Sequence, residues 1–279
     1  MNNINNIFKI SNVIFFLFVF FLILQSFDYH FGWGLNKMFP KVYLITFGTI
    51  DEGWSGSIWS ENGLIENVQV ILLFVTIIFL INLYLKLKYT KINLNFRYFI
   101  IIEILGLSYF LLEEISWGQQ IFNFQTTDLF LDTNSFLYNK QGETNLHNIS
   151  NLFNELPRAL VLIWCIIPIL LRKKIIYSNN YFLSIMCPSK KLFIVSIIIL
   201  IFFFPDFLIS KLNLIDYTNL HVIENGVFIK FNLNMLFLIT ISTNFLRLSE
   251  LQEFFYCYYF LWHTIFLKNL LIEKYVENN

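Results

Sequence analysis

Long runs of apolar residues are the feature that most constrains how this chain can fold. A helix needs about 20 mostly apolar residues to cross a bilayer, and a backbone in lipid must satisfy its own polar groups. Six such runs cover residues 7–27, 64–85, 98–115, 160–171 with apolar flanks, 192–209 and 251–271. The sequence therefore predicts an all-α, polytopic membrane helix bundle that forms a single integral-membrane domain over residues 1–279.

Composition agrees with this class and excludes others. Hydrophobic residues make up 57% of the chain and charged residues 14%, and the mean hydropathy is +0.61. A soluble domain of this size needs more charge to cover its surface. The formal net charge is zero, so no basic field indicates nucleic-acid binding. The three cysteines show no CxxC spacing, which argues against a cysteine zinc site. The expected partners are membrane lipids and other membrane subunits.

The number of spans depends on residues 227–245, an apolar stretch interrupted by Lys230, Asn232 and Asn234. Lysines and arginines between the second and third spans and between the fourth and fifth place both loops in the cytoplasm by the positive-inside rule. These residues are Lys86, Lys88, Lys91, Arg97, Arg172, Lys173, Lys174, Lys190 and Lys191. Six spans with both termini cytoplasmic are self-consistent. A seventh span would move Glu250 and Glu253 to the cytoplasmic side, away from the other acids.

The most informative polar motif is Glu-Glu-Ile-Ser-Trp-Gly-Gln-Gln, which begins at Glu113 at the outer end of the third span. Two glutamates at a helix C-terminus oppose the helix dipole, which favours cations there. Arg158 is a cation that follows Pro157 in the expected first turn of the fourth span, where the helix dipole favours anions. An ion pair between Arg158 and Glu113 or Glu114 would resolve both. Such a pair serves equally well as structural glue or as part of a site.

A second motif, Gln-Gly-Glu-Thr-Asn-Leu-His-Asn, begins at Gln141 in the following loop. Glu143 and His147 are spaced i, i+4, so on a helical turn they would point the same way, as two metal ligands or an acid–histidine relay do. With Glu114 they form the predicted set of metal ligands. Gln141 and Asn145 add polar groups that suit an ion or a head group. A histidine in a loop is otherwise simply solvated.

Other acids and histidines are weaker candidates. Glu66 opens the second span, where an acid is favoured by the helix dipole and needs no further explanation. Glu103 lies inside the third span, and a buried acid there is a functional candidate because its burial is costly. His263 lies deep in the last span, about 20 Å below Glu250 at about 1.5 Å per residue. That distance separates it from the outer acids.

The two motifs, in this order, resemble a family of uncharacterised bacterial multi-pass membrane proteins in which an EEISWGQ-type motif precedes a QGExNLHN-type motif. The resemblance covers the third span and the loop after it. It implies a bacterial inner (cytoplasmic) membrane protein and draws attention to these motif residues, without implying an activity.

Three functional hypotheses follow. The first is a membrane-embedded enzyme acting on a lipid or lipid-linked substrate at the outer face. Glu113, Glu114 and His147 would carry the catalysis with a divalent metal ion, and Trp117 and Gln119 would line the pocket. The second is a cation transporter with Glu103 as its mid-membrane station. The third is a non-catalytic membrane subunit or assembly factor whose polar motifs fix helix packing or dock a partner.

Overall fold

A computed structural model describes residues 2–31, 64–90, 92–122, 124–138, 144–146, 149, 151–177, 181–212 and 248–275. Helix accounts for 84% of this described part, and it contains no strand. The predicted all-α class is therefore confirmed for these residues. The ambiguous stretch 227–245 lies outside them.

Within the described residues, three helices are long and apolar enough to cross a membrane: α1 (Asn2–Phe31), α4 (Leu64–Leu87) and α5 (Leu94–Glu114). Their apolar side chains are not confined to the interior. On α4, Ile71, Phe74 and Ile78 are each roughly half exposed, at the three- and four-residue spacing of one helix face. Apolar faces of this length would aggregate in water, so they fit a surface that lipid covers.

The chain divides into two compact units, each built from two separate stretches of sequence. Unit 1 comprises Met1–Ile65 and Ile198–Glu253, and unit 2 comprises Glu66–Ile197 and Phe254–Asn279. In unit 1, α1 buries Phe8, Phe15, Val19 and Leu22, which share one helix face. Other apolar side chains of the helix are exposed: Ile7, Ile10, Val13, Ile14, Leu17 and Phe20.

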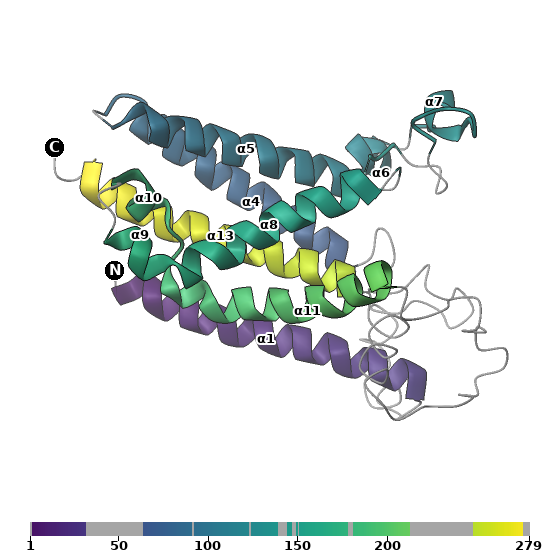
Figure 1. Ribbon diagram of the computed structural model, residues 1–279, viewed down its shortest axis with the longest axis horizontal. Coiled ribbons are helices and arrows are strands. Elements are labelled where there is room, and N and C mark those ends of the chain that lie inside the picture. Colours follow the sequence, from purple (N-terminus) through teal and green to yellow (C-terminus); the bar gives the residue numbers. More distant parts are fainter. Residues whose placement is uncertain are drawn as a thin grey trace. The chain divides into compact units, whose positions relative to one another are not determined.

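In unit 2, the helices α4, α5, α8 (Asn151–Leu170) and α13 (Leu248–Tyr275) lie side by side (Figure 1). Helix α13 contacts the other three. Its Lys268 Nζ lies 4.6 Å from the ring centroid of Phe79 on α4. The ring of Trp164 on α8 contacts both Phe99 on α5, at 5.5 Å between centroids, and His263 on α13, at 6.1 Å. A helix surrounded in this way is buried all round, as residues 254–260 are.

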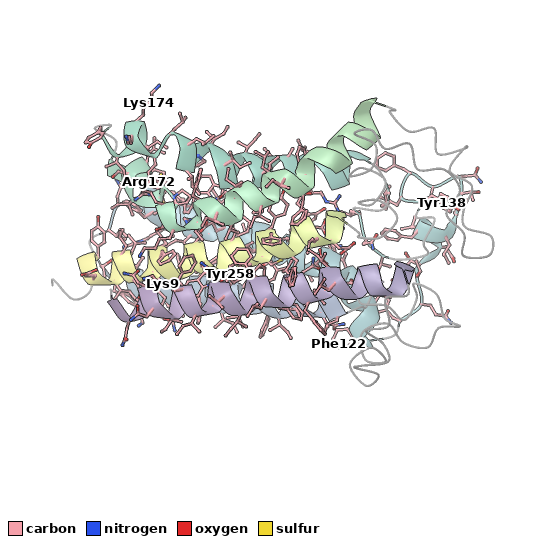
Figure 2. All side chains as sticks on the ribbon, turned by 90° about the horizontal axis from the view of Figure 1, so that it is seen from below. Lys9, Phe122, Tyr138, Arg172, Lys174 and Tyr258 are labelled. Atoms are coloured by element: carbon pink, nitrogen blue, oxygen red, sulfur yellow. The ribbon has the colours of Figure 1, made fainter. Side chains whose placement is uncertain are left out.

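The connections of unit 2 gather at two opposite ends of these helices. Phe122 and Tyr138 lie at one end, and Arg172 and Lys174 at the other (Figure 2). The first end holds η2 (Ser116–Gly118), α6 (Gln119–Phe122) and α7 (Asp128–Leu131). The second end holds α9 (Arg172–Ile176) and α10 (Tyr181–Met186). The chain continues through η3 (Lys190–Leu192) into α11 (Phe193–Leu212).

At the end of unit 2 where Arg172 and Lys174 lie, the Arg172 side chain stabilises the turn that follows α10. Its Nη1 donates to the carbonyl oxygen of Cys187 at 3.2 Å, and also to that of Pro188. Burial raises the pKa of the Cys187 thiol, although the neighbouring Arg172 charge acts in the opposite direction. All three cysteines, Cys165, Cys187 and Cys257, are buried and free of disulfides. Buried thiols of this kind are structural and unreactive.

One helix start predicted from sequence is wrong. Helix α8 begins at Asn151, not near Pro157, so Arg158 lies in its third turn. Proline favours the first helical turn, which is why the sequence suggested a start there, but it is also tolerated within a membrane helix when neighbouring groups satisfy the freed carbonyl. The unfavourable interaction expected between Arg158 and the helix N-terminus is therefore weaker than the sequence implied, because dipole effects fall off beyond the first turn.

Candidate functional site

The candidate site begins where α5 stops. After Glu114 and Ile115, three consecutive residues adopt positive φ angles: Ser116 at 45°, Trp117 at 55° and Gly118 at 92°. Left-handed backbone costs a residue with a side chain about 1–2 kcal/mol. Two such residues in succession persist only where surrounding contacts compensate, and strained backbone of this kind tends to occur at functional sites.

Gly118 is the one position in this turn where glycine is required. A Cβ at Gly118 would lie 3.2 Å and 3.3 Å from ring atoms of Phe122, in addition to meeting the conformational penalty at φ 92°. The glycine also lets its own N–H donate to the Ile115 carbonyl at 2.8 Å, which closes the turn. The Ser-Trp-Gly sequence therefore folds into this turn at the expense of strain that the rest of the site must offset.

Glu113 supplies part of that compensation. Its side chain is only 4% exposed, yet both carboxylate oxygens accept hydrogen bonds. The indole N–H of Trp117 donates to Oε1 at 2.6 Å, and the backbone N–H of Leu146 donates to Oε2 at 2.8 Å. Hydrogen bonds to a charged acceptor are about twice as strong as neutral ones. The carboxylate therefore binds the strained turn and the second motif at the same time.

Gln119 and Thr144 make the second connection between the motifs. The side-chain oxygen of Gln119 accepts from the backbone N–H of Thr144 at 2.9 Å and from its hydroxyl at 3.0 Å. The Thr144 hydroxyl also lies 2.7 Å from the carbonyl oxygen of Ser116. The side-chain N–H of Gln119 donates to the hydroxyl of Thr126 at 2.7 Å. We call this hydrogen-bonded set, Glu113, Ser116, Trp117, Gln119 and Thr144–Leu146, the motif clasp.

The remaining candidates fall into two groups. Among the described residues, Glu114 is the last residue of α5 and is 8% exposed, and Asn145 is 1% exposed, with Nδ2 at 3.5 Å from the Ser116 hydroxyl. Glu66 lies in the first turn of α4. The Arg158 carbonyl accepts from the Tyr256 hydroxyl at 3.3 Å, and its ion pair with Glu113 or Glu114 stays a prediction.

Gln141, Glu143 and His147 lie outside the described residues. Between them, Thr144, Asn145 and Leu146 form bends, not a helical turn, so the i, i+4 helical geometry expected for Glu143 and His147 is not found in the part that is described. Among the described residues, no group of three histidines, cysteines or acids is arranged to hold a metal ion. Of the three predicted ligands, only Glu114 belongs to that part.

Sequence reasoning missed Ser116, Thr126 and Thr144, which connect the motifs through hydroxyl and carbonyl groups. Ser116 and Thr144 stand inside the motifs but have no titratable group, and a search for acids and histidines passes over them. The available signal was their position: each lies next to residues that were singled out.

Neither a protein-family model, nor a curated protein, nor a solved structure matches this chain.

We predict that Thr144→Val destabilises the protein by about 1–3 kcal/mol, because it removes the hydroxyl that donates to the buried Ser116 carbonyl, while the Gln119 oxygen keeps the backbone N–H of residue 144. Thermal unfolding of the detergent-purified variant measures this loss. Thr127→Val is the matched control, because Thr127 is exposed and its side chain makes no capping hydrogen bond. It should change stability by less than about 0.5 kcal/mol. Equal effects of the two variants would contradict the clasp.

A second prediction compares two glycines. Gly118→Ala should destabilise the protein by about 1–2 kcal/mol through left-handed strain alone, with the Phe122 contact adding to the loss. Gly106 lies within α5 with nothing within 4 Å of an added Cβ. Gly106→Ala should therefore stabilise the protein by about 0.5–1 kcal/mol. The two melting temperatures should move in opposite directions, and a Gly118→Ala variant that melts no lower than the wild type would show that the Gly118 turn is not under strain.

Proposed function

We propose that the chain is a six-span membrane enzyme that acts on a lipid or lipid-linked substrate at the outer face. The observation that carries the proposal is the strained left-handed turn at Ser116–Gly118, held by buried hydrogen bonds from a segment 25 to 33 residues away. Helix packing alone is satisfied by ordinary caps, so a strained turn held this firmly favours a site whose shape matters.

Within this proposal the two adjacent glutamates have different roles. Glu113 is a positioning residue, because both its oxygens are already engaged. Glu114 is the proposed general base and metal ligand. Glu143 and His147 directly precede and follow Thr144–Leu146 in the chain, and we propose them as the other two metal ligands. A divalent ion bound there would activate water or polarise the substrate.

Trp117 supports a location at the membrane interface. Its ring is 43% exposed and packs edge-on against Tyr109 at 6.3 Å between centroids. An indole with one end exposed and its N–H buried on a carboxylate is typical of the boundary between lipid and water. A lipid head group at this depth would reach the polar end of α5 without leaving the bilayer.

The alternative is a non-catalytic membrane subunit or assembly factor. The saturation of Glu113 and Gln119 by partners within the chain favours it, because a group that holds structure needs no substrate. The enzyme proposal requires a reactive group besides these two side chains, and it assigns that role to Glu114 and His147.

Metal content separates the two. We expect the full-length protein, purified in detergent without chelators, to carry a near-stoichiometric divalent ion by elemental mass spectrometry. His147→Ala and Glu114→Gln should both lose it, whereas Glu273→Gln, an exposed carboxyl near the end of α13, should keep it. Monodispersity by gel filtration checks folding. A wild-type protein without an ion would overturn the metal-dependent mechanism and leave the subunit alternative ahead.

The topology of the proposal is tested with single cysteines at two exposed loop positions. Tyr89, between α4 and α5, is 86% exposed, and Phe136, beyond α5, is 83% exposed. In intact cells a membrane-impermeant maleimide should label Phe136→Cys, and it should label Tyr89→Cys only after permeabilisation. The native cysteines are buried and give the background. Labelling of both positions from the same side would exclude α5 as a span.

A further inference from the structure

Unit 2 contains a second polar cluster, in the middle of its helices and separate from the motif clasp. Glu103 lies near the midpoint of α5, and His263 lies near the midpoint of α13. The Nε2 atom of His263 is 3.5 Å from Oε1 of Glu103, and the two side chains are 3% and 9% exposed respectively. The sequence identified Glu103 and His263 as separate candidates, and the fold places their side chains together.

Among the described residues, neither side chain has another polar partner. Both carboxylate oxygens of Glu103 and Nε2 of His263 are buried without a hydrogen bond in the described structure, as are the hydroxyls of Tyr259 and Thr264 on α13. Native proteins pair nearly all their buried polar groups, so a group of such atoms in one region needs an explanation. Thr76 on α4 illustrates the usual solution, because its hydroxyl donates to the Leu72 carbonyl one turn earlier.

The described surroundings of the pair are aromatic, and no lysine or arginine among the described residues forms an ion pair with Glu103. Tyr259 stacks on His263 with 6.2 Å between ring centroids and 20° between the planes, and Trp164 on α8 meets the imidazole edge-on. The other titratable groups near this cluster are the thiols of Cys165 on α8 and Cys187 after α10, which interact with Tyr259, as Glu103 does. Within the described residues, His263 is the one ion-pair partner of Glu103.

Counting charge shows which state this environment favours. An ionised Glu103 beside a neutral His263 leaves a net negative charge among apolar rings, and a neutral acid beside an imidazolium leaves a net positive one. An isolated charge in such surroundings is costly. One proton on the pair removes the net charge, either as a carboxylic acid beside a neutral imidazole or as a carboxylate beside an imidazolium. Either form can donate across the short gap between the two side chains.

We propose that Glu103 and His263 form an intramembrane proton-binding site that holds one shared proton. A hydronium ion supplies the proton: one of its O–H bonds breaks, leaving water, and one bond forms, N–H on the imidazole or O–H on the carboxyl. Tyr259, whose ring stacks on His263, adds a further buried hydroxyl to the same stretch of α13. A protonatable station halfway along two membrane helices is what a protein needs to move protons or to couple its work to a proton gradient.

The test uses the full-length protein in lipid nanodiscs, with two spectroscopic probes. Infrared difference spectroscopy detects the carbonyl stretch of a protonated carboxylic acid, and ring ¹⁵N NMR of labelled histidine separates neutral from doubly protonated imidazole. The Glu103→Gln and His263→Asn variants assign the signals. At neutral pH we expect the protonated fractions of Glu103 and His263 to add up to about one proton per chain.

The variants should each affect the other partner. His263→Asn should leave Glu103 fully protonated, because a lone buried carboxylate is unfavourable, and Glu103→Gln should leave the His263 ring neutral. Glu273→Gln, the exposed carboxyl on the same helix, should change neither signal. Circular dichroism and gel filtration check folding, and if His263→Asn does not fold, the near-isosteric Glu103→Gln variant decides.

Two results would overturn the proposal. One is an ionised Glu103 beside a neutral His263 at neutral pH, which means that the pair holds no proton. The other is an ionised Glu103 in His263→Asn or a doubly protonated His263 ring in Glu103→Gln at neutral pH, which means that either group holds its charge there without its partner. Both outcomes are independent of the motif clasp and of any metal ion bound there, so they do not bear on the proposed enzyme.

Discussion

A buried carboxylate at the end of a helix is the interaction on which the polar end of this protein depends. Glu113 stands where the helix dipole disfavours an anion, and it is almost completely removed from water. The indole N–H of Trp117 and the backbone N–H of Leu146 satisfy it. The same two bonds hold a left-handed turn and attach a distant loop. Removing any one of these elements leaves a buried charge or a strained backbone without compensation, so they should be lost or kept together.

The two polar clusters of unit 2 follow opposite rules. In the motif clasp, the side chains of Glu113, Gln119 and Thr144 form hydrogen bonds with groups of the same chain. The arrangement is therefore rigid, and these groups have little freedom to react. In the Glu103–His263 pair, both carboxylate oxygens and the His263 Nε2 atom have no hydrogen-bond partner among the described residues. Saturated polar networks specify structure, whereas unsaturated ones are where ions, water or protons bind. This difference separates a positioning role from a binding role more clearly than residue type does.

The parts of the structure that could be predicted are those that depend on interactions between residues close together in the sequence. The apolar runs act locally, so the helices α1, α4, α5, α11 and α13 lie where the hydropathy of the sequence predicts them. The start of α8 was predicted wrongly because Asn151, Asn154 and Glu155 lower the hydropathy of its first turns. Pro157 also suggested a later start, because proline favours the first turn of a helix. The order and density of the two motifs drew attention to Glu113 and Asn145. Their partners were not predictable, because Thr144 bonds to residues 25 and 28 positions earlier in the chain.

The sequence by itself determined the class of the protein. Apolar runs of span length satisfy their backbone within each segment, so helix formation does not wait for tertiary contacts. Only the tertiary structure decided which polar groups meet. It brought Glu103 and His263 within 3.5 Å although they are 160 residues apart in the chain, and it joined two motifs through hydrogen bonds that no periodicity encodes. The physical reason is that burial and hydrogen bonding of a polar side chain depend on what faces it, and neighbours across a helix bundle are set by packing rather than by sequence separation.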